Sequence, residues 1–158
     1  MKRPEIALYQ PEIPPNTGTL IRLSSCLGVA LHIIHPCGFV WSDKQLVRSG
    51  LDYHDLATVI HHANFSQFLT SQAGKRVLPF DPKGQTPHVA FSYTNNDVLL
   101  FGQESCGFPN DILASFTHII SIPMLPGSRS LNLALATSIA VGEALRQTNS
   151  FYQAGENL

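Results

Sequence analysis

Polar side chains gather in a loop of the C-terminal third of the chain, where an apolar run gives way to an apolar helix. Residues 122–132 read Ile-Pro-Met-Leu-Pro-Gly-Ser-Arg-Ser-Leu-Asn. The two prolines interrupt regular structure, because each fixes φ and removes a backbone donor. Free backbone donors and small hydroxyls before a helix N-terminus suit a polar or anionic ligand. We therefore interpret Ser130 and Asn132 as candidate ligand-binding residues rather than parts of a plain turn, and expect Ser128 or Ser130 to cap the helix.

A second candidate loop reads Gly-Gln-Glu-Ser-Cys-Gly over residues 102–107. Gly102 would let a ligand approach the backbone closely. Glu104 is a lone carboxylate that could accept from ligand hydroxyls, orient an arginine, or simply be solvated. The chain contains neither the Gly-x-Ser-x-Gly elbow of serine hydrolases nor the Gly-x-x-x-x-Gly-Lys-Ser/Thr phosphate loop.

A third candidate stretch runs from Asn16 to Arg22, after a loop with three prolines. Arg22 stands among apolar neighbours, and a buried arginine almost always has a partner. Two interpretations stay open. Arg22 makes a structural ion pair or lies on an exposed helix face, or its guanidinium is aimed at a phosphate or a developing oxyanion.

Short apolar runs alternate with short helical patterns along the whole chain, which is typical of an α/β domain with a mostly parallel sheet flanked by helices. Asn16 or Thr17 would cap the first helix and Gly28 would end it. In such sheets ligands bind beyond the carboxyl ends of the strands, where all three candidate loops lie. We expect strands at 6–9, 30–34, 58–60, 76–80, 97–101 and 119–122, and helices at 18–27, 42–48, 64–71, 109–115 and 131–147.

The totals indicate one domain of 158 residues, with a loosely ordered tail from about 149 to 158. Only 13% of the residues are charged, against about 25% on average, which favours a homo-oligomer with a buried apolar face. The net charge of -1 gives no overall attraction to nucleic acid, so RNA binding would need a local basic patch. The basic candidates are Lys44 and Arg48, which share a helix face at i, i+4, together with Arg129 and Arg146.

Three irregularly spaced cysteines, no apolar leader and no long apolar run favour a cytoplasmic protein without a membrane span. The seven histidines show no metal-ligand spacing, so we expect no metal. His61 and His62 would point to opposite faces of a strand, and neither His32 nor His35 pairs with a nearby acidic motif.

Taken together, the three loops resemble the three motifs of the SpoU branch of the SPOUT RNA methyltransferases. The motifs are Pro-Pro-Asn-Thr-Gly-x-x-x-Arg at 14–22, Leu-Phe-Gly-Gln-Glu-x-x-Gly at 100–107 and Ile-Pro-Met-x-Pro-Gly-Ser-Arg-Ser-Leu-Asn-Leu at 122–133. The resemblance covers Ile6 to about Gln147. Residues 38–54 are also similar to a single-domain subgroup that methylates the wobble nucleotide of tRNA, cytidine or uridine 34.

This resemblance implies a deep C-terminal trefoil knot that binds S-adenosylmethionine through Phe80, Gly102, Ile122 and Ser130. It implies a homodimer that holds the tRNA anticodon stem-loop and methylates a ribose 2′-hydroxyl. Arg22 would then activate the hydroxyl. The pKa of a guanidinium is above about 12, so the group keeps its proton. We therefore expect Arg22 to stabilise the forming alkoxide rather than to act as a base. The other site residues would be Asn16, Ser130 and Asn132, which position Arg22 and the cofactor, and Glu104, which holds the loop or Arg22.

Two alternatives remain at this point: methylation of ribosomal RNA or of another tRNA position, and a non-catalytic nucleotide- or RNA-binding module. One residue departs from the family's pattern. Gly142 stands where members of this type often have a tyrosine, near the middle of the last helix.

Overall fold

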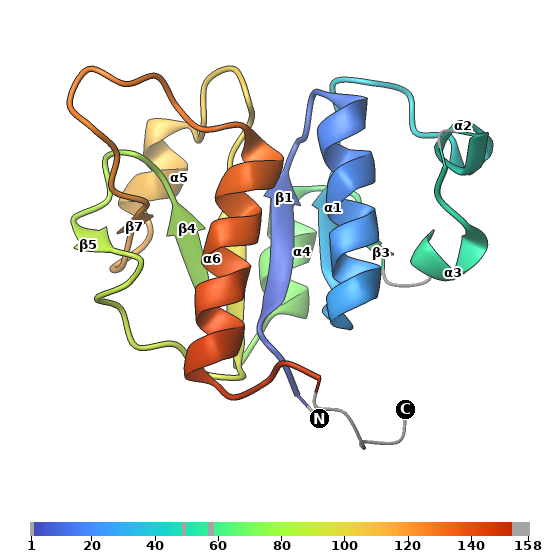
Figure 1. Ribbon diagram of the computed structural model, residues 1–158. Coiled ribbons are helices and arrows are strands. Elements are labelled where there is room, and N and C mark those ends of the chain that lie inside the picture. Colours follow the sequence, from blue (N-terminus) through green and yellow to red (C-terminus); the bar gives the residue numbers. More distant parts are fainter. Residues whose placement is uncertain (1, 49, 57–58, 153–158) are drawn as a thin grey trace.

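A seven-stranded parallel sheet forms the centre of the molecule (Figure 1). The computed structural model describes residues 2–48, 50–56 and 59–152. The strand order is β3-β2-β1-β6-β4-β7-β5, so the mostly parallel α/β fold expected from the sequence is confirmed. The strands are β1 (Glu5–Tyr9), β2 (Leu31–Ile34), β3 (Val59–His62), β4 (Arg76–Phe80), β5 (Thr86–Pro87), β6 (Asp97–Phe101) and β7 (Ile120–Ser121).

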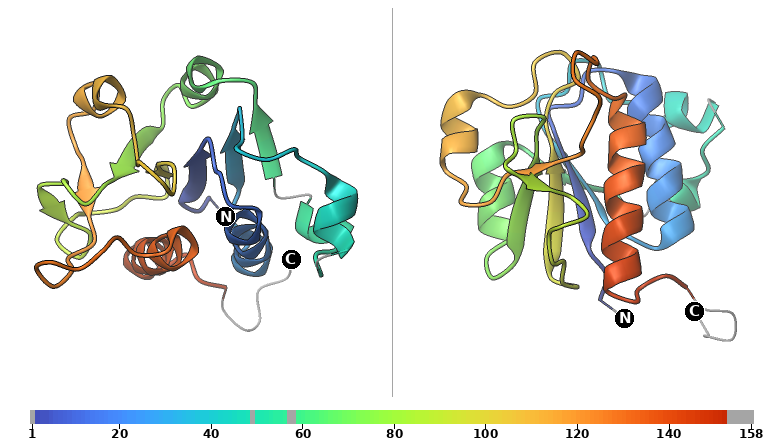
Figure 2. Two further views of the ribbon diagram at one scale, coloured as in Figure 1. Left: turned by 90° about the horizontal axis from the view of Figure 1, so that it is seen from above. Right: turned by 60° about the vertical axis from the view of Figure 1, so that its left-hand side comes forward.

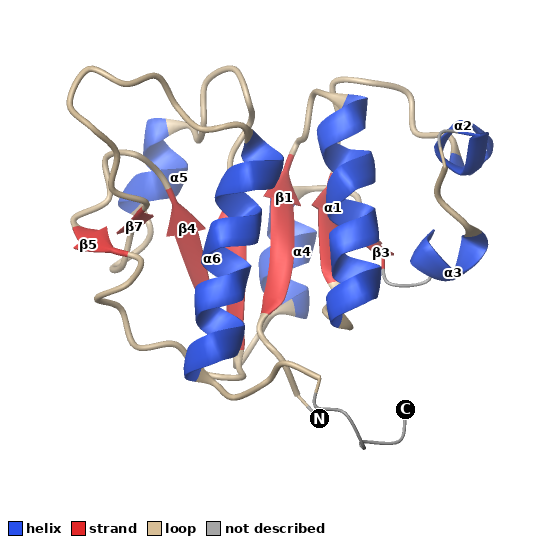
Figure 3. Cartoon of the chain, in the orientation of Figure 1, coloured by secondary structure: helices blue, strands red, loops and turns tan. Residues whose placement is uncertain are grey.

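Helices cover both faces of this sheet, as Figures 2 and 3 show. The two long helices, α1 (Pro14–Leu27) and α6 (Leu133–Gln147), lie on one face, and α4 (Phe65–Ser71) and α5 (Asn110–Ala114) lie on the other. The short helices α2 (Asp43–Arg48) and α3 (Tyr53–Leu56) lie beside α1 at the β3 end of the sheet. None of the helices in the described ranges is long and apolar enough to cross a membrane.

Apolar residues of the central strands build the core. All five residues of β6 are buried, as a strand between two helical layers requires. Alternate residues serve the two layers: Ile6 and Leu8 belong to the cluster under α1 and α6, while Ala7 and Tyr9 belong to the cluster under α4 and α5. The sheet thus fixes the position of every loop at its carboxyl edge.

Two helix starts differ from the sequence-based expectation. Helix α1 begins at Pro14 and its cap position is Ile13, so neither Asn16 nor Thr17 caps it. The two prolines that suggested a loop occupy the first turn, where a missing N–H costs nothing. Helix α6 begins at Leu133 and is capped by Asn132, not by Ser128 or Ser130. Gly28 ends α1 in the left-handed conformation, as expected.

The C-terminal part of the chain returns into the sheet between earlier strands. β7 pairs with β4 on one side and with β5 on the other. A Cβ built on Gly84 would come within 2.6 Å of the Ile120 carbonyl carbon, so the β4–β5 connection passes directly against β7. The trefoil knot implied by the family resemblance remains a prediction. Of the expected tail, Ser150 is buried and accepts a hydrogen bond from Arg3, and 153–158 lie outside the described residues.

Candidate active site

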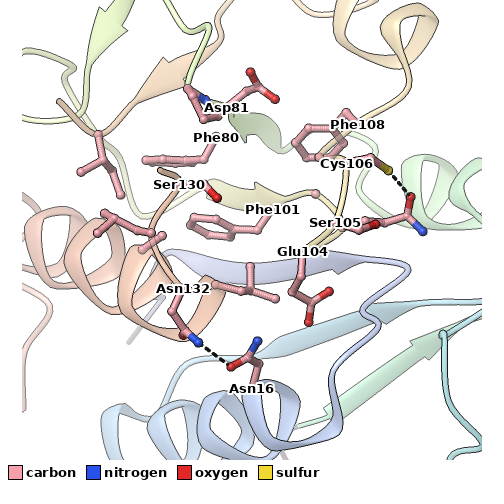
Figure 4. Close-up of a pocket in the computed structure, with 18 of the residues that line it drawn as sticks. Asn16, Phe80, Asp81, Phe101, Glu104, Ser105, Cys106, Phe108, Ser130 and Asn132 are labelled. Atoms are coloured by element: carbon pink, nitrogen blue, oxygen red, sulfur yellow. Dashed lines mark hydrogen bonds between the residues drawn. The ribbon is translucent and has the colours of Figure 1, made fainter. Parts of the chain in front are cut away.

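The three candidate loops meet at the carboxyl edge of the sheet around a cavity of about 540 Å³ (Figure 4). This volume is in the usual range for a small-molecule site. The cavity lies where the strand order reverses, beside β1, β6 and β4, which is the preferred ligand position in open α/β sheets. From the three loops come Ile13 and Asn16, then residues 102–108, then Ile122, Met124 and Ser130–Leu133.

Asn16 and Asn132 join the first loop to the third. Asn132 Nδ2 donates to Asn16 Oδ1 at 2.9 Å, across 116 residues of sequence. The other atom of the same amide, Asn132 Oδ1, accepts from the backbone N–H of Ala134 and Leu135 and so caps α6. Asn16 is 8% exposed. One amide therefore fixes both the start of α6 and the relative position of two of the loops.

Glu104 joins the first loop to the second. Its carboxylate accepts from the backbone N–H of Glu12 at 2.8 Å and of Ile13 at 3.1 Å. In return, the Glu12 carboxylate accepts from the backbone N–H and the hydroxyl of Ser105, each at 2.9 Å. This exchange satisfies free donors just before α1. Of the two roles expected for Glu104, the structure gives it a contact with the loop, whereas Arg22 has a different carboxylate partner.

The four residues expected at the cofactor, Phe80, Gly102, Ile122 and Ser130, all line the cavity. The Phe80 and Phe101 rings stack at 4.9 Å and form an apolar wall. A Cβ on Gly102 would meet the Gly107 carbonyl carbon at 2.6 Å, so only glycine lets the second loop fold this closely. An aromatic wall beside backbone and hydroxyl groups fits a ligand with an apolar ring and polar ends, such as S-adenosylmethionine.

A fourth loop contributes to the cavity, and the sequence analysis did not identify it. Asp81, Pro82 and Lys83 follow β4 directly and line the wall above Phe80. The Asp81 carboxylate accepts from the backbone N–H of Lys83 at 2.9 Å. The rule that ligands bind beyond the carboxyl ends of strands applied to this loop as much as to the other three, so it supplied a usable signal.

Arg22 does not line this cavity. It lies six residues beyond Asn16 on α1, so the two side chains are about 120° apart around the helix. Arg22 Nη1 lies 3.0 Å from Asp55 Oδ2, and Nη2 donates to the Gly50 carbonyl. The ion pair considered in the sequence analysis therefore exists, yet 47% of the Arg22 side chain stays exposed.

The four candidate RNA-binding residues lie apart from one another. Lys44 lines a second hollow of about 420 Å³ with His35, Trp41 and His61, and Arg48 is exposed at the end of α2. Arg129 is exposed in the third loop. Arg146 pairs with Glu143 at 2.8 Å, and hydrogen bonds from Arg146 and Gln147 lower the pKa of Glu143 to about 2.

The histidines pair across β2 and β3. His35 Nε2 and His61 Nδ1 are 2.9 Å apart, and so are His32 Nδ1 and His62 Nε2. His61 and His62 thus join different pairs, as their adjacent strand positions require. His32 also has an acidic partner that is distant in the sequence, because Glu5 Oε2 lies 2.8 Å from His32 Nε2. No group of three or more His, Cys, Asp or Glu within the described ranges is arranged to hold a metal ion.

Known proteins share this chain's sequence and fold. The tRNA (cytidine(34)-2′-O)-methyltransferase of Aeromonas hydrophila is 50% identical over 145 residues, covering 90% of this chain and 93% of its own. A protein solved in a study of 2′-hydroxyl methylation of C/U34 on tRNA is 41% identical with a TM-score of 0.85, covering 92% of this chain and 96% of its own. An AdoMet-bound rRNA methyltransferase from Sinorhizobium meliloti is 26% identical with a TM-score of 0.79, covering 91% of this chain and 56% of its own. The SpoU rRNA Methylase family matches residues 4–142, and the chain belongs to that family.

Proposed function

We propose that this protein transfers a methyl group from S-adenosylmethionine to the ribose 2′-hydroxyl of the tRNA wobble nucleotide, cytidine 34 or a modified uridine 34. One observation carries the proposal. Asn16 and Asn132, from the first and third motifs of an RNA methyltransferase family, are hydrogen-bonded to each other in the lining of a cofactor-sized cavity. A relative with half its residues identical over nearly the whole chain is named for this reaction.

The cofactor would supply a methyl group on a sulfonium centre, which is already a good leaving group. Phe80, Gly102, Ile122 and Ser130 would hold it, since all four line the cavity. Asn16 and Asn132 keep the first and third loops in register, and Glu104 keeps the second loop against the first. Their shared task is to align the nucleophile with the methyl group, because holding reacting groups in the right geometry lowers the barrier of such a transfer.

Arg22 would act in the cavity of a second protomer, because the cavity of its own protomer lies on another side of α1. A homodimer is supported by the exposed apolar residues Leu135 and Ile139 (59% and 43% exposed), which share one side of α6, and by Leu131 (37% exposed) just before the helix. Packing α1 and α6 against their copies would cover these residues and carry each guanidinium toward the partner's site. There Arg22 would stabilise the developing alkoxide as a permanent cation.

The remaining parts of the proposal follow from the family resemblance. One SpoU domain with a C-terminal trefoil knot spans residues 1–158, and the protein works in the cytoplasm. The anticodon stem-loop lies across the dimer, where Lys44, Arg48, Arg129 and Arg146 are available to its phosphates. Each of these side chains is exposed, which supports such contacts.

Methyl transfer tests the reaction and the position together. The protein is incubated with labelled S-adenosylmethionine and unfractionated tRNA, and the product is digested to nucleosides and mapped. The expected result is label in 2′-O-methylcytidine or a 2′-O-methyluridine at position 34. The matched control is a tRNA whose nucleotide 34 already carries a 2′-O-methyl group, which should accept none.

Two other outcomes would each replace the proposal. Label in ribosomal RNA or at another tRNA position would keep the reaction and overturn the substrate. Cofactor binding without transfer to any RNA, or no cofactor binding at all, would favour a non-catalytic binding module.

A further inference from the structure

We infer that Asp55 is the positioning residue for Arg22: its carboxylate, built into the short helix α3, fixes the direction in which the guanidinium is presented. This inference rests on the proposed function, because it concerns how that site obtains its cation. It assigns a purpose to α3 and to the segment before it, neither of which contributes to the cavity.

The contacts of Arg22 hold its guanidinium from one side. Nη1 faces both carboxylate oxygens of Asp55, at 3.3 Å and 3.0 Å, and Nη2 donates to the Gly50 carbonyl. A guanidinium has five N–H donors in one plane, so these contacts leave other donors free for a phosphate or an oxyanion. Two anchors on a planar group restrict its rotation, which a single flexible contact would not do.

Asp55 is itself held firmly. Its side chain is 3% exposed, and its Oδ2 accepts from the backbone N–H of Asp52 at 2.9 Å. In return, Asp52 Oδ1 accepts from the backbone N–H of Asp55 at 2.8 Å. The hydrogen bond from the Asp52 backbone, followed by the Ser25 hydroxyl and the Arg22 charge, holds the pKa of Asp55 below its usual value. The Asp55 carboxylate is therefore ionised at neutral pH.

The chain contains a second arginine–aspartate pair for comparison, Arg76 with Asp97. Asp97 is fully buried and binds Arg76 Nε and Nη2, each at 2.8 Å, while Arg76 also donates to a backbone carbonyl. That pair lies at the amino end of β6, away from the cavity. The two arginines are exposed to a similar degree, Arg22 by 47% and Arg76 by 40%. The pairs differ in their place instead, because Arg22 lies on α1, the helix that carries Asn16.

The test replaces Asp55 by Asn, which keeps size and removes charge, with Asp97→Asn as the matched control. Activity is measured on the intact dimer, well below the melting temperature of each variant. Asp55→Asn is expected to lower kcat by about 10²-fold, the effect of a misplaced group, with the KM for S-adenosylmethionine unchanged. Asp97→Asn is expected to lower the melting temperature and leave kcat near wild type. Asp55→Glu, which restores the charge, should recover part of kcat.

A double-mutant cycle separates positioning from a general structural effect. If Asp55 acts through Arg22, Asp55→Asn should cost nothing further in an Arg22→Ala background. An equal loss in both backgrounds, or wild-type kcat for Asp55→Asn, overturns the inference.

A second readout does not depend on activity. The side-chain N–H signals of Arg22 in NMR spectra should show slowed rotation in the wild type and free rotation in Asp55→Asn. Free rotation in the wild type overturns the inference even where methylation succeeds. Absence of methylation in a protein with an ordered Arg22 would instead refute the proposed function.

Discussion

Asn132 uses the two ends of one amide for two purposes, and substitutions can separate them. Asn132→Ala should remove the cap of α6, at a cost of about 1 kcal/mol in the free energy of unfolding, and also the bond to Asn16. Asn132→Ser should retain the cap but be too short to reach Asn16. We expect near-normal stability for Asn132→Ser with about a fivefold fall in kcat/KM, the value of one hydrogen bond.

Asn64 offers the matched control for this prediction. It caps α4 through the same kind of bond, from the Gln67 N–H at 2.8 Å, but lies away from the cavity. Asn64→Ala should lower the melting temperature as Asn132→Ala does and leave kcat/KM unchanged. Equal kcat/KM values for Asn132→Ser and the wild type would show that the bond to Asn16 has no part in activity.

His62 should make the stability of the fold depend on pH. It is buried, its Nε2 lies 2.9 Å from His32 Nδ1, and His32 Nε2 lies 2.8 Å from Glu5 Oε2. Burial, followed by the neighbouring imidazoles His32 and His61, lowers the pKa of His62 below 6.5. Between the lowered value and 6.5 the unfolded chain binds more protons than the folded one, so the free energy of unfolding rises with pH in that window.

Melting temperatures across that window measure this effect. The wild type should lose stability steadily as the pH falls below 6.5, and His62→Gln should show a shallower slope. His118→Gln, which removes an exposed imidazole, should keep the wild-type slope. An unchanged slope for His62→Gln would assign the pH dependence to other groups.

At the scale of elements, the connection from β2 to α2 holds a built-in reporter of RNA binding. Trp41 is the chain's one tryptophan, and it lines the same hollow as Lys44. Its ring lies 4.6 Å from His61 and 6.1 Å from Phe39, measured between ring centroids. If α2 holds the anticodon stem-loop, titration with that RNA should change the fluorescence of this residue.

Lys44→Gln should weaken RNA binding in that titration. It should also reduce the slope of the logarithm of the binding constant against the logarithm of the salt concentration by about 1, because one phosphate contact is lost. Lys75→Gln is the control, because Lys75 is engaged by Glu5 at 2.6 Å near the amino end of the strands. Fluorescence that stays constant while RNA binds would place the stem-loop elsewhere on the protein.

At the scale of the whole molecule, we expect the exposed apolar side of α6 to mediate the proposed dimer. Ile139→Glu should place a charge inside the proposed dimer interface and shift the protein to monomers in sedimentation experiments. Ile60→Glu is closely matched, since Ile60 on β3 has the same exposed fraction of 43%, and it should leave the dimer intact. A dimeric Ile139→Glu would mean that another face mediates association.

The fold class could be predicted from the sequence because the strands are short apolar runs with clear breaks. The ends of elements were less predictable. Pro14 and Pro15 indicate a loop or the first turn of a helix equally well, and the two serines expected to cap α6 stand within four residues of Asn132, which does cap it. α3 and β5 were missed because four and two residues are too few to show a period.

The candidate site was predictable as a place and less so as a set of contacts. The three loops could be assigned to one edge because parallel strands share their carboxyl ends. The partners of Glu104 and Arg22 could not be predicted, because they lie 92 and 33 residues away in the sequence and no local pattern links them. The specific reaction came from motif resemblance, as the same residues would serve many ligands.

The position of β7 between β4 and β5 has a consequence for biosynthesis. In the described part of the chain β5 pairs with β7 alone, and residues 88–119 separate the two. While the ribosome is still making the last third, β5 has no neighbour, and Ser130 and Asn132 do not yet exist. The N-terminal strands can assemble during translation, but this edge can close only after β7 and the third loop have been made. A chain truncated by early termination would therefore be defective in cofactor binding even where most of its sheet had formed.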